Sequence, residues 1–261
     1  MIHSTAIISD RAKIGSNVEI GPYSIIGDNV EIADNVKIMS HVCVDGDTYI
    51  GEGTQVFPFA AIGFCPQDLK FHGEKSKVII GRNNSIREYV TIHPGTEGGV
   101  MRTVIGDNNL LMIGVHVAHD CIVGNNTVLA NNVTLAGHVE VGDYAIIGGL
   151  SAVHQFVRIG HNAIIGGMTG VERDVIPFGA VKGEGGHLYD INILGLKRAN
   201  YSREEIVALR EAYQIIFFGD KVLWENLEAA EKKLSNFDGV KEIVNFMRYK
   251  SNRSYCLPKG K

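Results

Sequence analysis

Histidines cluster in the middle of the chain, at a place where they could move protons. Four of them fall between His116 and His154, inclusive, and His119 is followed directly by Asp120. An imidazole titrates near neutral pH, so it can take a proton from a hydroxyl group as a general base. A neighbouring carboxylate would fix the tautomer of the ring, provided that both residues lie at a turn, because neighbours in a strand point to opposite faces. The candidate chemistry is therefore proton transfer by His119, supported by Asp120.

A repeat of six residues determines how these side chains are positioned. The period fits neither an α-helix nor a long strand; it is typical of short strands joined by tight turns, with one aliphatic side chain per strand pointing inward. The pattern predicts a hexapeptide-repeat solenoid, a left-handed parallel β-helix with triangular coils. The aliphatic positions of the repeat are Ile8, Ile14, Ile20, Ile26, Ile32, Ile38, Val44, Ile50, Val56, Ile62, Ile80, Ile86, Ile92, Ile105, Leu111, Val117, Val123, Leu129, Leu135, Val141, Ile147, Val153, Ile159, Ile165 and Val171.

The triangular coil brings the chemically interesting residues together. Three six-residue strands close one coil, so residues 18 positions apart should stack about 4.8 Å from each other. By this rule His119 lies next to Gly137, Asp120 lies next to His138, and His154 follows on the same corner one coil further. The Gly137 N–H is then placed to hydrogen-bond an oxyanion that forms beside His119.

No nucleophile accompanies this base and this N–H donor. The sequence has no Gly-x-Ser-x-Gly motif, and Cys121 takes a small inward position of its hexad, where it is expected to pack in the core. A base without a nucleophile favours direct acyl transfer. Zinc is an alternative, because some hexapeptide solenoids are carbonic anhydrases and His116, His119 and His138 could serve as ligands. In a third reading the histidines are ordinary surface residues.

Two segments break the register of six, at about 64–78 and 94–103, and we predict that both are loops ejected from the coil. Insertions of this kind often decorate one binding face of a solenoid. The register fades beyond Pro177, and helical spacing begins near Ile191. We therefore divide the chain into a β-helix at 1–187 and a C-terminal helical domain at 188–261.

The helical domain is predicted from caps and apolar spacing. Ser202 and Glu205 form a capping box at the start of one helix. Further amphipathic helices are expected at about 222–234, with Val222 turned inward, and at about 240–249. These helices should cover the last coil and keep its open edge from pairing.

Composition excludes several classes of protein. Hydrophobic residues make up 45% of the 261 residues, which is the ordinary share of a globular protein and excludes a disordered chain. The 31 glycines against 6 prolines indicate repeated tight turns. The four cysteines form no C-x-x-C pair, the N-terminus is no signal peptide, and no apolar run approaches the roughly 18 residues of an integral membrane segment. We expect a cytoplasmic protein that does not bind nucleic acid.

Charge is distributed unevenly along the chain. The formal net charge is −4, yet residues 191–261 carry 13 Lys and Arg against 9 Asp and Glu. A basic segment of this kind either faces an acidic partner or is a solvated helical surface.

Several motifs closely resemble those of UDP-N-acetylglucosamine O-acyltransferases, the family that makes the first committed intermediate of lipid A. The resemblance covers nearly the whole chain. The related N-acyltransferases carry an extra N-terminal domain, whereas the repeat here begins at Ile8. The matching motifs are Gln67-Asp68-Leu69-Lys70, Ile86-Arg87-Glu88, Asp107-Asn108-Asn109-Leu110-Leu111-Met112, His116-Val117-Ala118-His119-Asp120-Cys121, Leu129-Ala130-Asn131-Asn132, Leu135-Ala136-Gly137-His138, Ala152-Val153-His154-Gln155-Phe156 and Gly195-Leu196-Lys197-Arg198.

The resemblance implies a homotrimer with active sites in the clefts between subunits, and no cofactor of its own. The donor would be an (R)-3-hydroxyacyl chain carried on the phosphopantetheine of acyl carrier protein. The acceptor would be the glucosamine 3-hydroxyl of UDP-N-acetylglucosamine. The basic C-terminal part would then help to dock the acidic carrier protein.

The resemblance also implies a role for individual residues. His119 would be the general base, Asp120 would support it, and the Gly137 N–H would hold the oxyanion. Gly167 matches the position that limits acyl-chain length, and its missing side chain would admit a longer chain. Substrate-binding residues would be Gln67, Asp68 and Lys70 in the first loop, His93, His116, His138, His154 and Gln155 around the site, and Asn192 and Arg198 at the uridine diphosphate.

Two departures from the family pattern leave the acceptor sugar open. Ala199 follows Arg198 where the family often has a second arginine, and Leu194 replaces an acidic residue. The 3-amino analogue of the sugar, which would give an amide, therefore remains an alternative acceptor. An acetyltransferase that uses acetyl-CoA and a trimeric scaffold or sugar-nucleotide-binding protein are the other readings.

Overall fold

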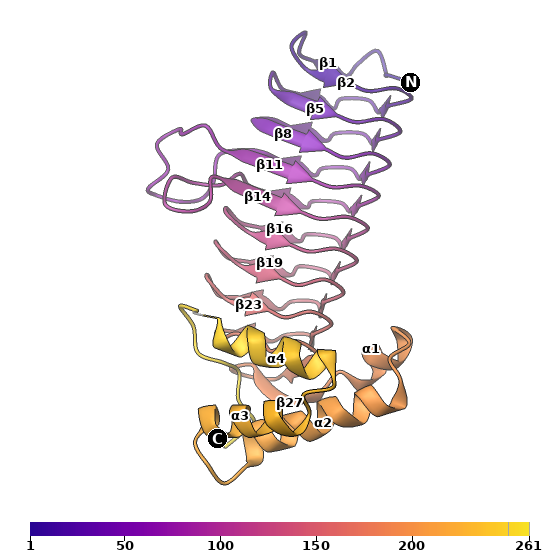
Figure 1. The fold of residues 1–261 in the computed structure, drawn as a ribbon. Helices are drawn as coiled ribbons and strands as arrows, with labels where there is room; N and C mark the ends of the chain where they lie inside the picture. Colours follow the sequence, from indigo (N-terminus) through magenta and orange to yellow (C-terminus); the bar gives the residue numbers. More distant parts are fainter. Residues whose placement is uncertain (250, 261) are drawn as a thin grey trace.

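The computed structural model describes residues 1–249 and 251–260. The chain winds into a tall stack of coils, and four helices gather at its C-terminal end (Figure 1). Three mostly parallel sheets form the sides of the stack, with strands that are far apart in sequence as neighbours. The left-handed parallel β-helix with a C-terminal helical region, predicted from the sequence, is confirmed.

Each side of the stack is one sheet. The first sheet has nine strands: β1 (Ile7–Ile8), β4 (Ile25–Ile26), β7 (Cys43–Val44), β10 (Ala61–Ile62), β13 (Thr91–Ile92), β16 (His116–Val117), β19 (Thr134–Leu135), β22 (Ala152–Val153) and β25 (Gly170–Val171). The second has eight: β2 (Lys13–Ile14), β5 (Val30–Ile32), β8 (Asp47–Ile50), β11 (Lys77–Ile80), β14 (Arg102–Ile105), β17 (Ile122–Val123), β20 (Glu140–Val141) and β23 (Arg158–Ile159). The third has ten: β3 (Glu19–Ile20), β6 (Lys37–Ile38), β9 (Gln55–Val56), β12 (Ser85–Ile86), β15 (Leu110–Leu111), β18 (Val128–Leu129), β21 (Ile146–Ile147), β24 (Ile164–Ile165), β26 (Gly179–Lys182) and β27 (His187–Ile191).

The repeat of six explains why most strands are only two residues long. In β9 the Gln55 side chain is exposed and Val56 is buried, and this pattern recurs through the stack. The buried aliphatic residues form one continuous core inside the coils. Turn positions such as Asn35 have a positive φ of 60°, which asparagine tolerates better than most residues. The strands therefore pair in the predicted register, with Ile14 opposite Ile32.

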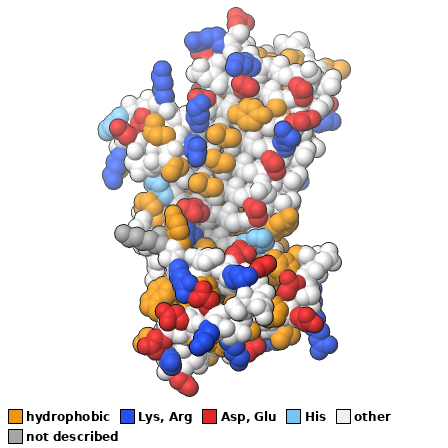
Figure 2. Space-filling model, viewed as in Figure 1, with side chains coloured by type: hydrophobic (Ala, Val, Ile, Leu, Met, Phe, Trp, Pro, Cys, Tyr) orange, Lys and Arg blue, Asp and Glu red, His pale blue; other side chains and the backbone are white. Residues whose placement is uncertain are grey.

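Charged side chains on the outside follow the same register. Lys13 lies 3.2 Å from Glu31, and Lys77 lies 3.3 Å from Asp47 on the eight-stranded side. Figure 2 shows this face, where side chains of both signs are interspersed with apolar ones. Exposed ion pairs of this kind contribute roughly 0–1 kcal/mol each. They therefore reinforce a stack whose stability comes from the apolar core.

Two loops leave the coil on one side of the stack (Figure 1). Loop 1 comprises residues 63–76, between β10 and β11, and loop 2 comprises residues 93–101, between β13 and β14. Both loops end about two residues earlier than predicted. The reason is that β11 and β14 pair with each other over four residues, beginning with Lys77 opposite Arg102, whereas the repeat marks only the inward side chain of a short strand.

The coil ends in a hairpin. β26 continues the ten-stranded sheet in parallel with β24, and β27 then adds an antiparallel strand to β26. The predicted domain boundary between residues 187 and 188 falls at the first residue of β27, so the division into two domains stays a prediction. Residues 250 and 261 of the predicted helical domain lie outside the described residues.

Among the described residues, four helices follow the hairpin: α1 (Ile193–Arg198), α2 (Arg203–Phe218), α3 (Leu223–Lys233) and α4 (Asp238–Arg248). The predicted capping box of Ser202 and Glu205 starts α2. Val222 was predicted to point inward, and this was wrong: it is the N-cap residue of α3 and is 66% exposed. Apolar spacing does not distinguish the first helical residue from the cap before it. None of the helices in residues 1–249 and 251–260 is long and apolar enough to cross a membrane.

Candidate active site

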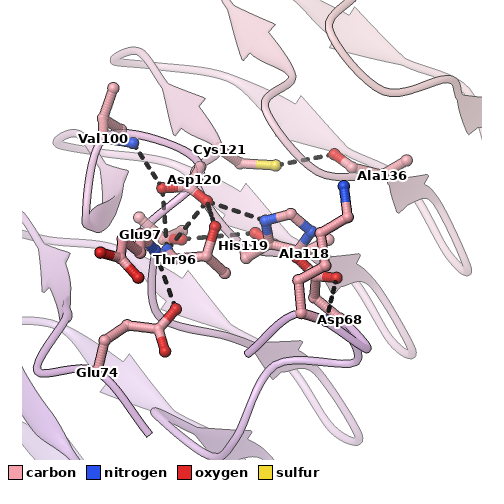
Figure 3. Close-up of polar contacts among 12 residues, drawn as sticks. Asp68, Glu74, Thr96, Glu97, Val100, Ala118, His119, Asp120, Cys121 and Ala136 are labelled. Atoms are coloured by element: carbon pink, nitrogen blue, oxygen red, sulfur yellow. Dashed lines mark hydrogen bonds and ion pairs between the residues drawn. The ribbon is translucent and has the colours of Figure 1, made fainter. Parts of the chain in front are cut away.

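His119 and Asp120 lie in the turn between β16 and β17, which satisfies the condition set by the sequence. Asp120 has a φ of 59°, so the chain bends there and the two side chains can meet. His119 Nδ1 lies 2.9 Å from Asp120 Oδ2. The carboxylate is buried and the imidazole is half-buried (Figure 3).

Loop 2 encloses the Asp120 carboxylate. The backbone N–H of Thr96 donates to Oδ2 at 3.0 Å, the Thr96 hydroxyl donates to the same oxygen at 2.7 Å, and the Val100 N–H donates to Oδ1 at 2.8 Å. Burial by itself raises the pKa of Asp120, but the hydrogen bonds from His119, Thr96 and Val100 outweigh it and hold the pKa below its ordinary value. Asp120 is therefore an ionised acceptor.

An ionised Asp120 fixes the tautomer of His119. A carboxylate can only accept, so Nδ1 of His119 must carry the proton in this contact. The lone pair of the neutral ring is then on Nε2, the nitrogen that faces away from Asp120. His119 is thus held in the tautomer that a general base needs.

Gly137 lies against the Nε2 edge of the ring, as the stacking rule predicts. A Cβ added to Gly137 would lie 2.5 Å from Cε1 and 2.6 Å from Nε2 of His119, so a larger residue here would displace the ring. Within the described parts of the chain, its backbone N–H has no acceptor. The base and a free N–H donor are therefore neighbours.

His138 extends the cluster along the corner. Its ring is edge-on to His119, with 5.0 Å between centroids, and is stacked on Phe156 at 4.4 Å. Burial lowers the pKa of His138, opposed by the negative charges of Asp120 and Asp68. His138 is therefore held toward its neutral form.

The rings of His93 and His116 are neighbours, with centroids 5.1 Å apart, and burial together with His119 lowers the pKa of both. His116 Nδ1 is 2.7 Å from the Thr91 hydroxyl. His93 is only 7% exposed and its Nδ1 has no hydrogen-bond partner among the described residues. Burial, reinforced by His116 and His119, lowers the pKa of His93 to about 4, so this ring is neutral at physiological pH.

Loop 1 carries three of the predicted substrate-binding residues. Asp68 Oδ1 accepts from the Lys70 N–H at 3.0 Å, and the Asp68 charge acts on His138, so this part of the loop lies at the histidine cluster. Gln67 and Lys70 are exposed and open to a ligand. Figure 3 shows Asp68 on the His119 side of the site.

His154 and Gln155 are exposed on the same corner, and a residue from the far end of the chain reaches them. The Arg253 guanidinium lies 2.6 Å from His154 Nδ1 and donates to the Gln155 carbonyl at 3.0 Å. The sequence gives no signal for this contact, because Arg253 lies 98 positions after Gln155.

Three predicted residues lie away from this corner. Asn192 is buried as the N-cap of α1, where its side chain accepts from the Gly195 N–H and donates to the Asn162 carbonyl. Arg198 is exposed at the C-terminal end of α1. Gly167 lies in the turn between β24 and β25, on a different corner from His119. One chain by itself does not bring these residues to the base.

Sequence reasoning missed the residues that support Asp120 from loop 2, Thr96 and Val100, and the Phe156 ring beneath His138. For Phe156 a signal exists, because it lies 18 positions after His138 and must stack on it. For Thr96 and Val100 the only signal is that loop 2 leaves the same corner as Asp120, one coil earlier in the stack.

Three residues could in principle hold a metal ion. In the described part of the chain, ligand atoms of His119, Asp120 and His138 lie within 4.8 Å of one another. Both carboxylate oxygens of Asp120 already accept hydrogen bonds from protein donors. The group is thus built to hold a protonated imidazole nitrogen rather than to offer a free carboxylate. His116, a ligand in the zinc alternative, does not belong to this group.

Fold and site together define a hexapeptide-repeat transferase. A family model described as bacterial transferase hexapeptide matches residues 11–46 and 102–137. A second, described as UDP N-acetylglucosamine O-acyltransferase, domain 2, matches residues 174–256.

Close relatives identify the particular family. The chain is 54% identical to an acyl-[acyl-carrier-protein]–UDP-N-acetylglucosamine O-acyltransferase of Rickettsia bellii, over 98% of this chain and 91% of the relative. A Rickettsia rickettsii protein of the same name is 55% identical, over 98% and 97%. The UDP-N-acetylglucosamine acyltransferase structure from Bacteroides fragilis has a TM-score of 0.95 at 42% identity and covers 98% of this chain and 99% of that one. The Francisella novicida structure has a TM-score of 0.96 at 36% identity and covers 100% and 95%. The chain therefore belongs to the UDP-N-acetylglucosamine O-acyltransferase family and is an acyltransferase.

Proposed function

We propose that this enzyme transfers an (R)-3-hydroxyacyl chain from acyl carrier protein to the glucosamine 3-hydroxyl of UDP-N-acetylglucosamine, the first step of lipid A biosynthesis. The observation that carries the proposal is the His119–Asp120 contact beside Gly137, in a chain of this family. No cofactor is part of the proposal, because the phosphopantetheine arrives on the carrier protein.

The reaction is a direct attack on the donor thioester. Nε2 of His119 takes the proton of the acceptor hydroxyl as its oxygen bonds to the thioester carbonyl carbon. The Gly137 N–H stabilises the resulting oxyanion. When the tetrahedral intermediate collapses, the carbon–sulfur bond breaks, and the imidazolium returns its proton to the leaving thiolate.

No acyl-enzyme is part of this mechanism. The cysteine nearest to the base, Cys121, is buried and its thiol donates to the Ala136 carbonyl at 3.1 Å. Burial raises the pKa of Cys121 to about 12, so it is no thiolate at neutral pH. The acceptor oxygen is the nucleophile.

The remaining predicted residues would hold the two substrates. Gln67, Asp68 and Lys70 in loop 1 would hold the sugar nucleotide and the hydroxyl region of the acyl chain. The site would be lined by His93, His116, His138, His154 and Gln155. Arg198 and Asn192 would contact the uridine diphosphate, and Gly167 would set the acyl-chain length.

A homotrimer would complete the site, because the corner with Gly167 is not the corner with His119. The Gly167 corner supports this arrangement with a strip of exposed apolar side chains. Tyr89, 59% exposed, stacks on Phe59 at 5.1 Å near the N-terminal end, and Met168, 78% exposed, lies toward the other end. A second copy of the chain that covers this strip would bring Gly167 of one subunit to His119 of the next.

The basic C-terminal part would dock the acidic carrier protein, and the enzyme would work in the cytoplasm. Acyl carrier protein, the proposed donor, is acidic, so a basic surface would attract it. A comparison of donors and acceptors tests the function. The purified protein receives UDP-N-acetylglucosamine or its 3-amino analogue, together with 3-hydroxyacyl carrier protein, 3-hydroxyacyl-coenzyme A or acetyl-coenzyme A. We expect transfer from carrier protein to be preferred and to weaken with salt. Equal use of acetyl-coenzyme A would instead support an acetyltransferase, and transfer only to the 3-amino sugar would correct the acceptor.

A further inference from the structure

The tips of the two loops are joined through one carboxylate. Glu74 of loop 1 is half-buried, and its Oε1 accepts the backbone N–H of Glu97 in loop 2 at 2.9 Å. Its Oε2 accepts the His72 N–H of its own loop, also at 2.9 Å. Figure 3 shows Glu74 reaching up to the loop that surrounds Asp120. Each oxygen of Glu74 therefore holds the backbone of a different loop.

Glu97, whose N–H donates to Glu74, follows directly after Thr96, which makes two hydrogen bonds to Asp120. Thr96, which precedes Glu97, gives Asp120 both its N–H and its hydroxyl. Loop 2 turns sharply here, with the Gly99 N–H donating to the Thr96 carbonyl at 3.0 Å. It approaches so closely that a Cβ on Gly99 would lie 2.2 Å from Asp120 Cγ. A small movement of the loop 2 tip would therefore displace the carboxylate that holds His119.

We propose that Glu74 is a positioning residue that links loop 1, through the backbone of loop 2, to the orientation of the His119–Asp120 pair. The role rests on the proposed function. Loop 1 also carries Asp68 and Lys70, so the loop that would bind substrate is the loop that fixes the base. A ligand that orders loop 1 would thereby favour the His119 tautomer needed for proton transfer.

The charge of Glu74 supports this role. The Glu97 N–H holds the pKa of Glu74 below its ordinary value, with a further contribution from the His72 N–H. The side chain is therefore ionised at neutral pH, and hydrogen bonds to an ionised acceptor are stronger than neutral ones.

The test uses the full-length enzyme and compares Glu74→Ala with Glu74→Gln. Loss of a hydrogen bond to a charged group should lower kcat of Glu74→Ala about tenfold, with little change in the KM of UDP-N-acetylglucosamine. Glu74→Gln keeps one acceptor oxygen and should recover part of the rate. Glu184→Ala, which removes an exposed carboxylate from the distant β26–β27 hairpin, is the control and should match the wild type.

A double-mutant cycle decides whether Glu74 acts through Asp120. In an Asp120→Asn background, Glu74→Ala should cause no further loss, because the contact it supports is already broken. Equal losses in both backgrounds, or a rise in KM without a change in kcat, would overturn the proposal.

A spectroscopic readout separates this inference from the proposed reaction. Proton NMR of the wild type should show the hydrogen-bonded Nδ1–H of His119 as a downfield resonance that Asp120→Asn abolishes. Glu74→Ala should broaden or remove it, and an unchanged resonance would overturn the role of Glu74 even if the protein transferred no acyl group. Failure of acyl transfer with an intact Glu74 effect on this resonance would instead count against the function.

Discussion

Asp120 shows how one residue changes what another can do. His119 could be protonated on either nitrogen, but an ionised carboxylate 2.9 Å from Nδ1 leaves only Nε2 as the base. Four donated hydrogen bonds, from His119, Thr96 and Val100, keep this carboxylate ionised despite burial. The sequence predicts the pair because the residues are adjacent. It does not predict the donors, because they come from a loop with no repeat.

His93 should make the enzyme less stable in mild acid. With its pKa lowered to about 4, His93 stays neutral in the folded chain, whereas the unfolded chain protonates it near the ordinary value of about 6.5. The unfolded state therefore binds more protons between these values, and the free energy of unfolding falls as the pH falls through this window.

The measurement is urea unfolding of the wild type and His93→Gln at pH 7.5 and pH 5, at one protein concentration. Between pH 7.5 and pH 5 the free energy of unfolding should fall by about 2 kcal/mol more in the wild type than in the variant. Equal losses in the two proteins would show that His93 is not held neutral.

Gly167 should determine which acyl chain is preferred. A Cβ there would meet only the Gly149 backbone, 3.2 Å from its oxygen, a tight contact that a shift of a few tenths of an ångström relieves, so Gly167→Met should fold. One methylene in an apolar pocket changes the discrimination between substrates about tenfold or more. The ratio of kcat/KM values should therefore shift toward shorter chains by at least that factor. Competition between donors of different chain length measures it. Turnover on the shortest donor should stay near that of the wild type, and unchanged selectivity would place the end of the groove elsewhere.

At the level of elements, the coil is predictable and the loops are not. The repeat of six specifies a strand, a turn and an inward side chain locally, so strands as far apart as β1 and β25 follow from one rule. Loops 1 and 2 end earlier than the repeat predicts because β11 and β14 extend over four residues. This extension depends on pairing with a strand in the next coil, which the local sequence does not show. Val222 departs from the prediction because an apolar N-cap residue continues the spacing of the helix's apolar residues just as a first helical residue would. The six-residue helix α1 is too short to give a periodic signal.

Two neighbouring glycines should show how closely loop 2 fits Asp120. A Cβ on Gly99 would lie 2.2 Å from Asp120 Cγ, whereas a Cβ on Gly98 has no neighbour within 4 Å. Because a misplacement of about 1 Å can cost about 10²-fold in rate, Gly99→Ala should lose activity on that scale and Gly98→Ala should not. Steady-state transfer rates at matched folding, checked by thermal unfolding, give the comparison. Similar rates for the two variants would mean that loop 2 moves aside freely.

At the level of the whole molecule, different corners of the stack carry different groups of residues. The His119 corner collects the base, the two loops and Arg253 from the C-terminal end, while the Gly167 corner carries exposed aromatic and aliphatic side chains. Stacking in steps of 18 predicts the residues on each corner. It does not predict Arg253, or the Asn192 cap that lies away from the base, because those contacts depend on how the helices fold back on the coil.

The apolar corner should be the contact between subunits. Tyr89→Lys places a charge in a strip that the proposed trimer buries, so it should dissociate the assembly and lower transfer with it. Sedimentation should show the wild type at three times 28.4 kDa and the variant at lower mass. Val222→Lys, at an exposed position on the helical part, is the control and should leave the mass unchanged. A wild type of 28.4 kDa, or a variant that stays trimeric, would contradict this arrangement.

The central claim is that His119 is the base of an acyl transfer to UDP-N-acetylglucosamine. The most direct test is the transfer rate of the purified wild type, with labelled 3-hydroxyacyl carrier protein, beside His119→Ala and a control, His3→Ala, at the exposed N-terminus. The rate should fall by about 10²–10⁴-fold in His119→Ala and stay unchanged in His3→Ala. Wild-type transfer that survives in His119→Ala would contradict the claim and place the base on another residue.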